Sequence, residues 1–163
     1  MGALAWSQNL MGRRDDVAAA NEPAYAWSPQ LVEELRGEHR ALIKRYTEIE
    51  KLALSARTQA IPHGLSAFKS KFNVHTLREN LHCYAYLENS LAKRPAELAA
   101  VIKLRDQMDA IGHRLLDFVE KYRSSGVSRT NAQEFLNGLR AIGKLLQERI
   151  QRVEAELYPR YKP

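Results

Sequence analysis

Apolar residues recur three or four positions apart over four long stretches of the chain, which has 163 residues. This spacing places them on one side of an α-helix, so the pattern predicts four amphipathic helices. The first helix is expected to begin at Ser28 and to end before a loop that contains residues 61–64. The second covers about residues 65–91. The third runs from Pro95 to just before Gly126, and the fourth lies between Thr130 and Pro159.

Individual residues mark the expected ends of these helices. Ser28 is suited to the N-cap of the first helix, and Pro29 suits its first helical position. Pro95 can open the third helix, and Thr130 with Gln133 resembles a capping box for the fourth. Four helices of about 22 to 29 residues with short-to-moderate connections predict an all-α fold, an up-down-up-down four-helix bundle.

The predicted bundle occupies residues 28–163. Residues 1–27 show no sustained periodicity, so we expect a flexible N-terminal arm. In this arm the arginine pair follows the short apolar stretch, which is the wrong order for a secretory signal. No apolar run approaches the ~20 residues that span a membrane. The one cysteine, Cys83, excludes an intramolecular disulfide and fits a reducing compartment, so a cytoplasmic location is expected.

The charge pattern limits the classes of partner. The net charge is +6, but lysine and arginine alternate with acidic residues, as in KRYTEIEK and KLRDQMD. There is no basic run with interleaved aromatic residues of the kind that follows a phosphate backbone. The sequence therefore favours neither nucleic acid nor a membrane as partner, and it leaves a protein partner or a homo-oligomer open.

An unusual stripe of residues lies along the second predicted helix. Its members are four or three positions apart and are Phe68, Phe72, His75, Glu79, His82 and Tyr86. Ionisable groups on a buried face are costly unless they pair with each other, with a metal or with an opposite charge. The stripe therefore marks the candidate functional site, although the pattern alone does not name an activity.

Two histidines and a carboxylate in this bundle form a candidate metal site. His75 and Glu79 stand one helical turn apart, and His39 lies in the middle of the first helix. Two imidazoles and a carboxylate can hold one non-haem iron ion with open positions. His82 lies about 10 Å from His75 along the axis, at ~1.5 Å per residue, so it is expected at the pocket edge together with Tyr46 and Tyr86.

Three segments resemble the hemerythrin-like (HHE cation-binding) domain family. They are LRGEHRALIKRY, HTLRENLHCYAYL and ERIQRVEAELYP, and the resemblance covers about residues 29–161. It implies a four-helix bundle with a di-iron centre, in which each half supplies a His from its first helix and a His-x-x-x-Glu from its second. In the first half of this chain those positions are His39, His75 and Glu79.

The second half departs from that family pattern. The three ligand positions there hold Gly112, Arg149 and Val153, while the neighbouring His113 belongs to the solvated face of its helix. A complete di-iron site cannot be assembled from these positions. Arg149 lies at about the depth of Glu79 and can bind a carboxylate, so a buried ion pair can take the place of the missing metal.

Three hypotheses for function follow, and the sequence leaves them open. The first is a non-catalytic regulatory or protein-interaction bundle without a metal, in which the histidines are core residues. A weaker resemblance of EFLNGLRAIGKLLQERIQRVEAEL to the last helix of the bacterial regulator-of-sigma-D anti-sigma family supports it. The second is a mononuclear iron protein that senses or handles oxygen, nitric oxide or peroxide. The third is an acid–base enzyme, although no nucleophile–base pair and hence no catalytic residue is evident.

Overall fold

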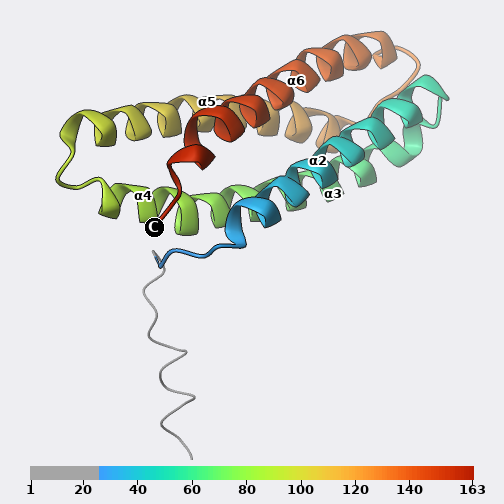
Figure 1. Cartoon of the computed structure of the whole chain (residues 1–163). Coiled ribbons are helices and arrows are strands. Elements are labelled where there is room, and N and C mark those ends of the chain that lie inside the picture. The colour runs from blue at the N-terminus through green and yellow to red at the C-terminus, as the bar shows by residue number, and fades with distance from the viewer. Residues whose placement is uncertain (1–25) are drawn as a thin grey trace, which may run out of the picture.

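The computed structural model describes residues 26–163, which form an antiparallel bundle of long helices (Figure 1). The helices and helical segments are α2 (Leu31–Leu54), α3 (Ile61–Arg78), α4 (Ala85–Ser90), α5 (Pro95–Ser125) and α6 (Ala132–Arg152), with a short 3₁₀ turn at Thr58–Ala60, π-helical segments at Glu79–Tyr84 and Val153–Leu157, and a 3₁₀ turn at Tyr158–Arg160. The first π segment joins α3 to α4, so these make one continuous rod. The all-α, four-helix bundle predicted from the periodicity is confirmed.

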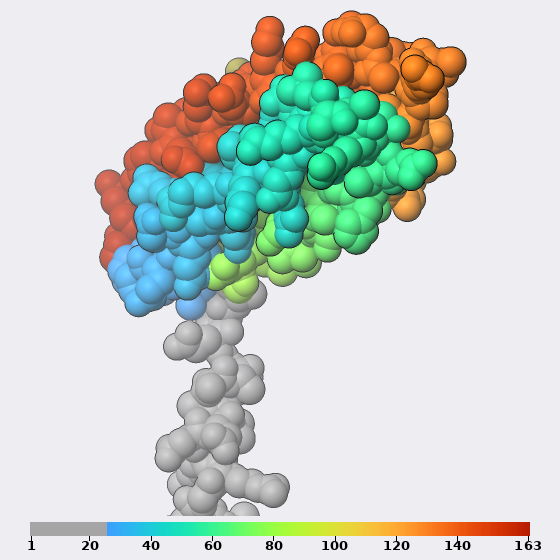
Figure 2. Space-filling model, turned by 90° about the vertical axis from the view of Figure 1, so that its right-hand side faces the viewer, coloured from blue at the N-terminus to red at the C-terminus, as the bar shows by residue number. Residues whose placement is uncertain are grey.

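The order of the helices around the bundle follows from their contacts. Helix α2 packs against α3 and α6, and α5 packs against α3 and α6 on the opposite side. Figure 2 shows the surface of the α2 side, with α3 along one flank and α6 along the other. Each helix therefore contacts the helices before and after it in the chain, and side chains from all four meet along the central axis.

The core consists of the apolar faces that the sequence predicts. Most of the residues expected to point inward are buried, and the larger fully buried ones are Leu35, Leu42, Phe72, Met108, Leu115, Phe135, Leu146 and Leu157. Three others expected inward, Tyr46, Phe118 and Ile150, are partly buried against this core. In residues 26–163, no helix is both long and apolar enough to cross a membrane.

Two predicted N-terminal caps are wrong. Helix α2 begins at Leu31 with Gln30 at the N-cap position, and the backbone N–H of Ser28 donates to the hydroxyl of Tyr161 at 2.8 Å. Helix α6 begins at Ala132, and the Thr130 hydroxyl contacts that of Ser128 rather than capping the helix. In both cases the hydroxyl that was predicted to cap a helix contacts another side chain instead, Gln30 for Ser28 and Ser128 for Thr130.

Residues 61–64, predicted as a loop, are the first turn of α3. Pro62 lies in that turn, where a missing N–H has no cost, and Ile61 is fully buried. The connection between α2 and α3 is correspondingly short. It contains Ala56, whose positive φ of 55° lets the chain reverse direction.

The π segment Glu79–Tyr84 changes which face of the second rod is buried. Because a π turn contains more residues than an α turn, Cys83, Tyr84 and Leu87 follow Glu79 on the inner face. His82 is exposed and Tyr86 is only partly buried, so their placement on the buried stripe was wrong. The Cys83 thiol is buried, and burial raises its pKa, so it stays protonated and unreactive.

The predicted arm of residues 1–27 lies almost entirely outside the described residues, so it stays a prediction. The division of the chain into that arm and a bundle from residue 28 likewise stays a prediction.

Candidate metal centre

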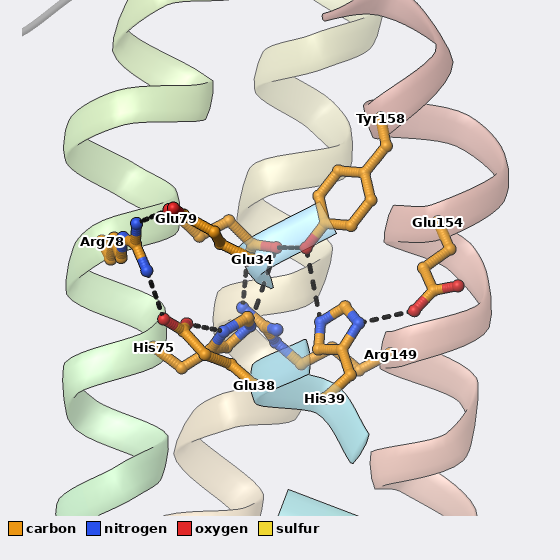
Figure 3. Close-up of polar contacts among 9 residues, drawn as sticks. All are labelled: Glu34, Glu38, His39, His75, Arg78, Glu79, Arg149, Glu154 and Tyr158. Carbon is orange, nitrogen blue, oxygen red and sulfur yellow. Dashed lines mark hydrogen bonds and ion pairs between the residues drawn. The ribbon is translucent and has the colours of Figure 1, made fainter. Parts of the chain in front are cut away.

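His39, His75 and Glu79 meet in the centre of the bundle (Figure 3). His39 comes from the middle of α2, and His75 and Glu79 come from adjacent turns where α3 passes into the π segment. Their side chains are 3%, 1% and 0% exposed. One ligand atom from each lies within 4.8 Å of the others, and the two imidazole rings are 4.7 Å apart between centroids.

Both imidazoles are oriented by a carboxylate on their outer nitrogen. His39 Nδ1 lies 2.7 Å from Oε1 of Glu154, and His75 Nδ1 lies 2.8 Å from Oε2 of Glu38. Carboxylates only accept hydrogen bonds, so each Nδ1 carries the proton and donates. In the neutral rings, both Nε2 atoms are therefore unprotonated. This is the arrangement that orients histidine ligands and increases their basicity at metal sites.

The carboxylate of Glu38 belongs to a small ionic cluster at the edge of the site. Arg78 donates to Glu38 at 2.7 Å and also pairs with Glu34, as Figure 3 shows. Burial raises the pKa of Glu38, but the hydrogen bonds from His75 and Arg78 outweigh it and hold that pKa below its usual value. Glu38 therefore stays a carboxylate, as its hydrogen bond to His75 requires.

The two oxygens of Glu79 have different partners. Oε2 accepts a hydrogen bond from Arg149 Nη2 at 2.8 Å, and Oε1 accepts one from the Tyr158 hydroxyl at 2.9 Å. Oε1 is also the oxygen nearer His75, 3.8 Å from its Nε2. The buried ion pair of Glu79 and Arg149 that the sequence suggested is present. It compensates the charge of Glu79 on one side and leaves Oε1 facing the imidazoles.

Burial shifts the pKa values of His39 and Tyr158 in the site. It lowers the pKa of His39 below the usual value, even though the hydrogen bond to Glu154 acts in the opposite direction. The Tyr158 hydroxyl lies 3.4 Å from His39 Nε2, and burial raises its pKa, so it remains a hydrogen-bond donor. A neutral imidazole and a neutral phenol are the forms in which these groups can bind or support a cation.

Three other residues assigned to the pocket lie elsewhere. His82 is exposed, the hydroxyl of Tyr86 donates to the carbonyl of Lys162, and that of Tyr46 donates to the carbonyl of Leu139. The structure therefore brings Arg149 to the site but not these three. His113 is exposed, in agreement with its predicted place on the solvated face of α5.

The second half of the bundle lacks the matching ligand set. Gly112 is buried on α5, and Val153 begins the second π segment just as Glu79 begins the first. The Tyr84 hydroxyl is buried and has no hydrogen-bond partner within residues 26–163, whereas Tyr158 donates to Glu79. A π segment occurs in both halves of the bundle. A carboxylate that accepts a hydrogen bond from the buried tyrosine hydroxyl is found for Tyr158 but not for Tyr84 in these residues.

A family comparison identifies this bundle. The hemerythrin HHE cation binding domain matches the chain over residues 30–161. The chain belongs to this hemerythrin family. No curated protein and no solved structure gives a significant match.

The residues of this hemerythrin-family chain fit one metal ion and not two. One ligand atom from each of His39, His75 and Glu79 converges, and His75 Nε2 is a buried polar atom without a hydrogen-bond partner among residues 26–163. At the second position the guanidinium of Arg149 is already bonded to Glu79. A permanent cation there excludes a second metal ion from the same space.

Sequence reasoning missed Glu38, Glu154 and Tyr158. Glu38 precedes His39 in the sequence, and Glu154 follows Val153. Neighbouring residues of a helix point to different faces, so neither carboxylate was expected at the site. Tyr158 lies near the end of the family-like segment ERIQRVEAELYP. Its place in the Leu-Tyr-Pro segment was the one available signal.

Proposed function

We propose that this protein binds one iron ion through His39, His75 and Glu79 and uses it to sense or handle oxygen, nitric oxide or peroxide. The observation that carries the proposal is the buried Nε2 of His75, which has no hydrogen-bond partner in the described part of the chain and faces Glu79 while its Nδ1 is held by Glu38. Leaving a buried acceptor without a hydrogen bond costs about 1–3 kcal/mol. A bound cation removes that cost.

The surrounding residues have distinct parts in this proposal. Iron held by two imidazoles and a carboxylate keeps open positions for a small ligand and supplies the redox chemistry. Glu38 and Glu154 orient the two rings and increase their basicity. Arg149 holds the outer oxygen of Glu79, and Tyr158 supplies a hydroxyl donor inside the site.

A second candidate is a metal-free regulatory or protein-interaction bundle. Two observations favour it. Glu79 already has a hydrogen bond to each oxygen, from Arg149 and Tyr158, so its charge is compensated without an ion. In addition, Val74, Leu77 and Leu81 are 61%, 59% and 47% exposed along one side of the second rod, which gives a partner an apolar surface.

Iron titration of variants at the orienting carboxylates tests the first candidate. Glu38→Gln and Glu154→Gln keep the size of the side chain but remove the charge that supports each imidazole. We expect each to weaken iron binding by about 10- to 100-fold. The measurement is an anaerobic Fe(II) competition titration on the full chain.

Glu33→Gln is the matched control, because Glu33 lies on α2 and pairs only with exposed arginines in the described residues. It should leave iron affinity unchanged. Equal affinities for all four proteins would show that Glu38 and Glu154 do not support a metal site. The absence of any Fe(II) binding by the unaltered chain would favour the metal-free candidate.

A further inference from the structure

A cavity lies between α3 and α5, and none of the three candidate metal ligands lines it. Its volume is about 320 Å³, within the usual range of small-molecule pockets. Its inner wall is formed by buried residues and its mouth by exposed or partly exposed ones. The residues used below are Phe72, Thr76, Met108, Asp109, Gly112 and Arg149.

Two polar groups on the wall of this cavity have unused hydrogen-bonding capacity. Arg149 is 2% exposed, and its Nε has no acceptor among the described residues. The Oγ1 atom of Thr76 is also buried and unpartnered there. Buried polar groups are nearly always hydrogen-bonded, so two orphans on one cavity wall indicate a site for a polar group of a ligand.

Part of the remaining wall is apolar, whereas Asn73, Asn80, Asp109 and His113 add polar groups nearer the mouth. The guanidinium carbon of Arg149 lies 5.5 Å from the centre of the Phe72 ring, and Met108 is fully buried beside this cavity. An apolar wall with a few convergent polar groups is the usual composition of a ligand site. An occupant therefore needs a compact apolar body as well as a polar end.

The charges around the cavity disfavour an anion. The charge of Arg149 is already compensated by Glu79, which lies 2.8 Å from it. Asp109 at the cavity adds an acidic group that is only partly buried. A carboxylate placed beside Arg149 would bring an uncompensated negative charge into a buried site, and such a charge is costly. A neutral acceptor such as a carbonyl can accept from Nε without that cost.

Gly112 keeps the cavity open. A Cβ atom at this position would lie 3.5 Å from the Phe72 ring, so alanine would just touch it and a longer side chain would fill the space. The cavity thus occupies the position in the second half of the bundle where the family pattern has a ligand side chain.

We propose that this cavity binds a small uncharged molecule with an apolar body and a carbonyl group. The carbonyl oxygen accepts a hydrogen bond from Arg149 Nε, and the Thr76 hydroxyl bonds to the same polar end. The apolar body packs on Phe72 and Met108. This inference goes beyond the proposed iron site and does not depend on it, since none of His39, His75 and Glu79 lines the cavity.

Benzamide is a suitable probe, because it combines a neutral carboxamide with an aromatic ring. The test is a titration of the metal-free full chain near pH 8, where an ordinary histidine is uncharged, followed by amide shifts in two-dimensional NMR. We expect saturable shifts centred on Thr76 and Gly112. Toluene, which lacks the acceptor, and benzoate, which carries a charge, should each bind at least about tenfold more weakly.

Two variants test the location. Gly112→Leu should abolish benzamide binding, and Thr76→Val should weaken it about fivefold through loss of one hydrogen bond. Gly37→Leu is the matched control, because Gly37 lies on α2 and a Cβ there meets only the end of Arg40. It should bind like the unaltered chain, and thermal unfolding of all three variants verifies that each is folded.

Several results would overturn the inference. They are unsaturable shifts with benzamide, equal affinity for benzamide and toluene, tighter binding of benzoate, or full binding by a folded Gly112→Leu protein. Failure of this test leaves the iron titration unaffected, because that titration depends on different residues.

Discussion

At the scale of single residues, Arg149 occupies one side of the candidate metal site. It supplies a fixed positive charge 2.8 Å from Glu79 in a site where both side chains are at most 2% exposed. A hydrophobic pair would avoid the cost of desolvating two charges, so the ion pair is not explained by stability alone. It leaves one oxygen of Glu79 free of the arginine and turned toward the two imidazoles.

A double-mutant cycle measures this contact. Arg149→Met leaves the charge of Glu79 uncompensated in the core and should lower the free energy of unfolding by about 3–5 kcal/mol. Glu79→Leu leaves the charge of Arg149 uncompensated and should have an effect of the same size. Joining the two substitutions should recover much of the loss. Denaturant unfolding of the metal-free protein gives the four values. Coupling below about 0.5 kcal/mol would show that the two residues act independently.

The pH dependence of stability should report the carboxylate of Glu38. Its pKa is held below the ordinary value of 4.5 in the folded chain, so the unfolded chain takes up a proton first as the pH falls. The stabilisation is therefore present above about pH 4.5 and is lost below it. His39, whose folded pKa is lowered from 6.5, begins to reduce stability at higher pH than Glu38 does.

The variant Glu38→Gln separates these two effects. Its unfolding free energy should fall less steeply below about pH 4.5 than that of the unaltered chain. Denaturant unfolding of the metal-free proteins across this pH range provides the comparison. Identical slopes at low pH would mean that the Glu38 pKa is not shifted by folding.

At the scale of elements, two π segments shape the site. One begins at Glu79 and the other at Val153, the two positions that the family resemblance aligns. A π turn contains one more residue than an α turn, so the next buried position after Glu79 comes one residue later. Cys83 is therefore buried, and His82 is exposed. Such segments occur frequently at functional sites, and here one of them carries a candidate ligand.

Deleting one residue from the first π segment should be tolerated. Removal of the exposed Leu81 lets the segment become α-helical and keeps Cys83, Tyr84 and Leu87 on the face of Glu79, at offsets of three, four and seven. Removal of the exposed Lys71 from α3 instead rotates all later residues by about 100° relative to the core. We expect cooperative unfolding with Leu81 deleted and loss of folding with Lys71 deleted.

Circular dichroism and thermal unfolding of the two deletion variants make the comparison. Equal damage from both deletions would mean that the π segment is not a removable one-residue insertion. Iron binding by the Leu81 deletion variant would further show whether the π geometry is needed to direct Glu79.

The elements also show what the sequence could and could not predict. Inner faces with uniform spacing, such as Leu104, Met108 and Leu115, were predictable because burial selects the helical period directly. His82 was misplaced because the π segment changes that period without any marker in the sequence. Glu38 and Glu154 were missed because their partners lie on other helices, and the pairing depends on the tertiary packing.

At the scale of the whole molecule, three of the four rods build the centre, and the fourth lines the cavity beside it together with the α3 rod and Arg149. Rod α2 contributes His39 and Glu38, the α3 rod contributes His75 and Glu79, and the α6 rod contributes Arg149, with Glu154 and Tyr158 from its last turns. Rod α5 lines the cavity through Met108, Asp109 and Gly112. The family fold is retained, and Arg149 stands at one of the positions where the family resemblance implies a ligand of a second half-site.

The iron content of the protein tests this account most directly. The full chain, purified without a metal-affinity tag and then loaded anaerobically with Fe(II), should hold a single iron ion per chain by elemental analysis. Glu79→Gln should hold none, while Glu33→Gln should match the unaltered chain. No iron after loading would contradict the proposed site, and about two ions per chain would contradict the replacement of the second position by Arg149.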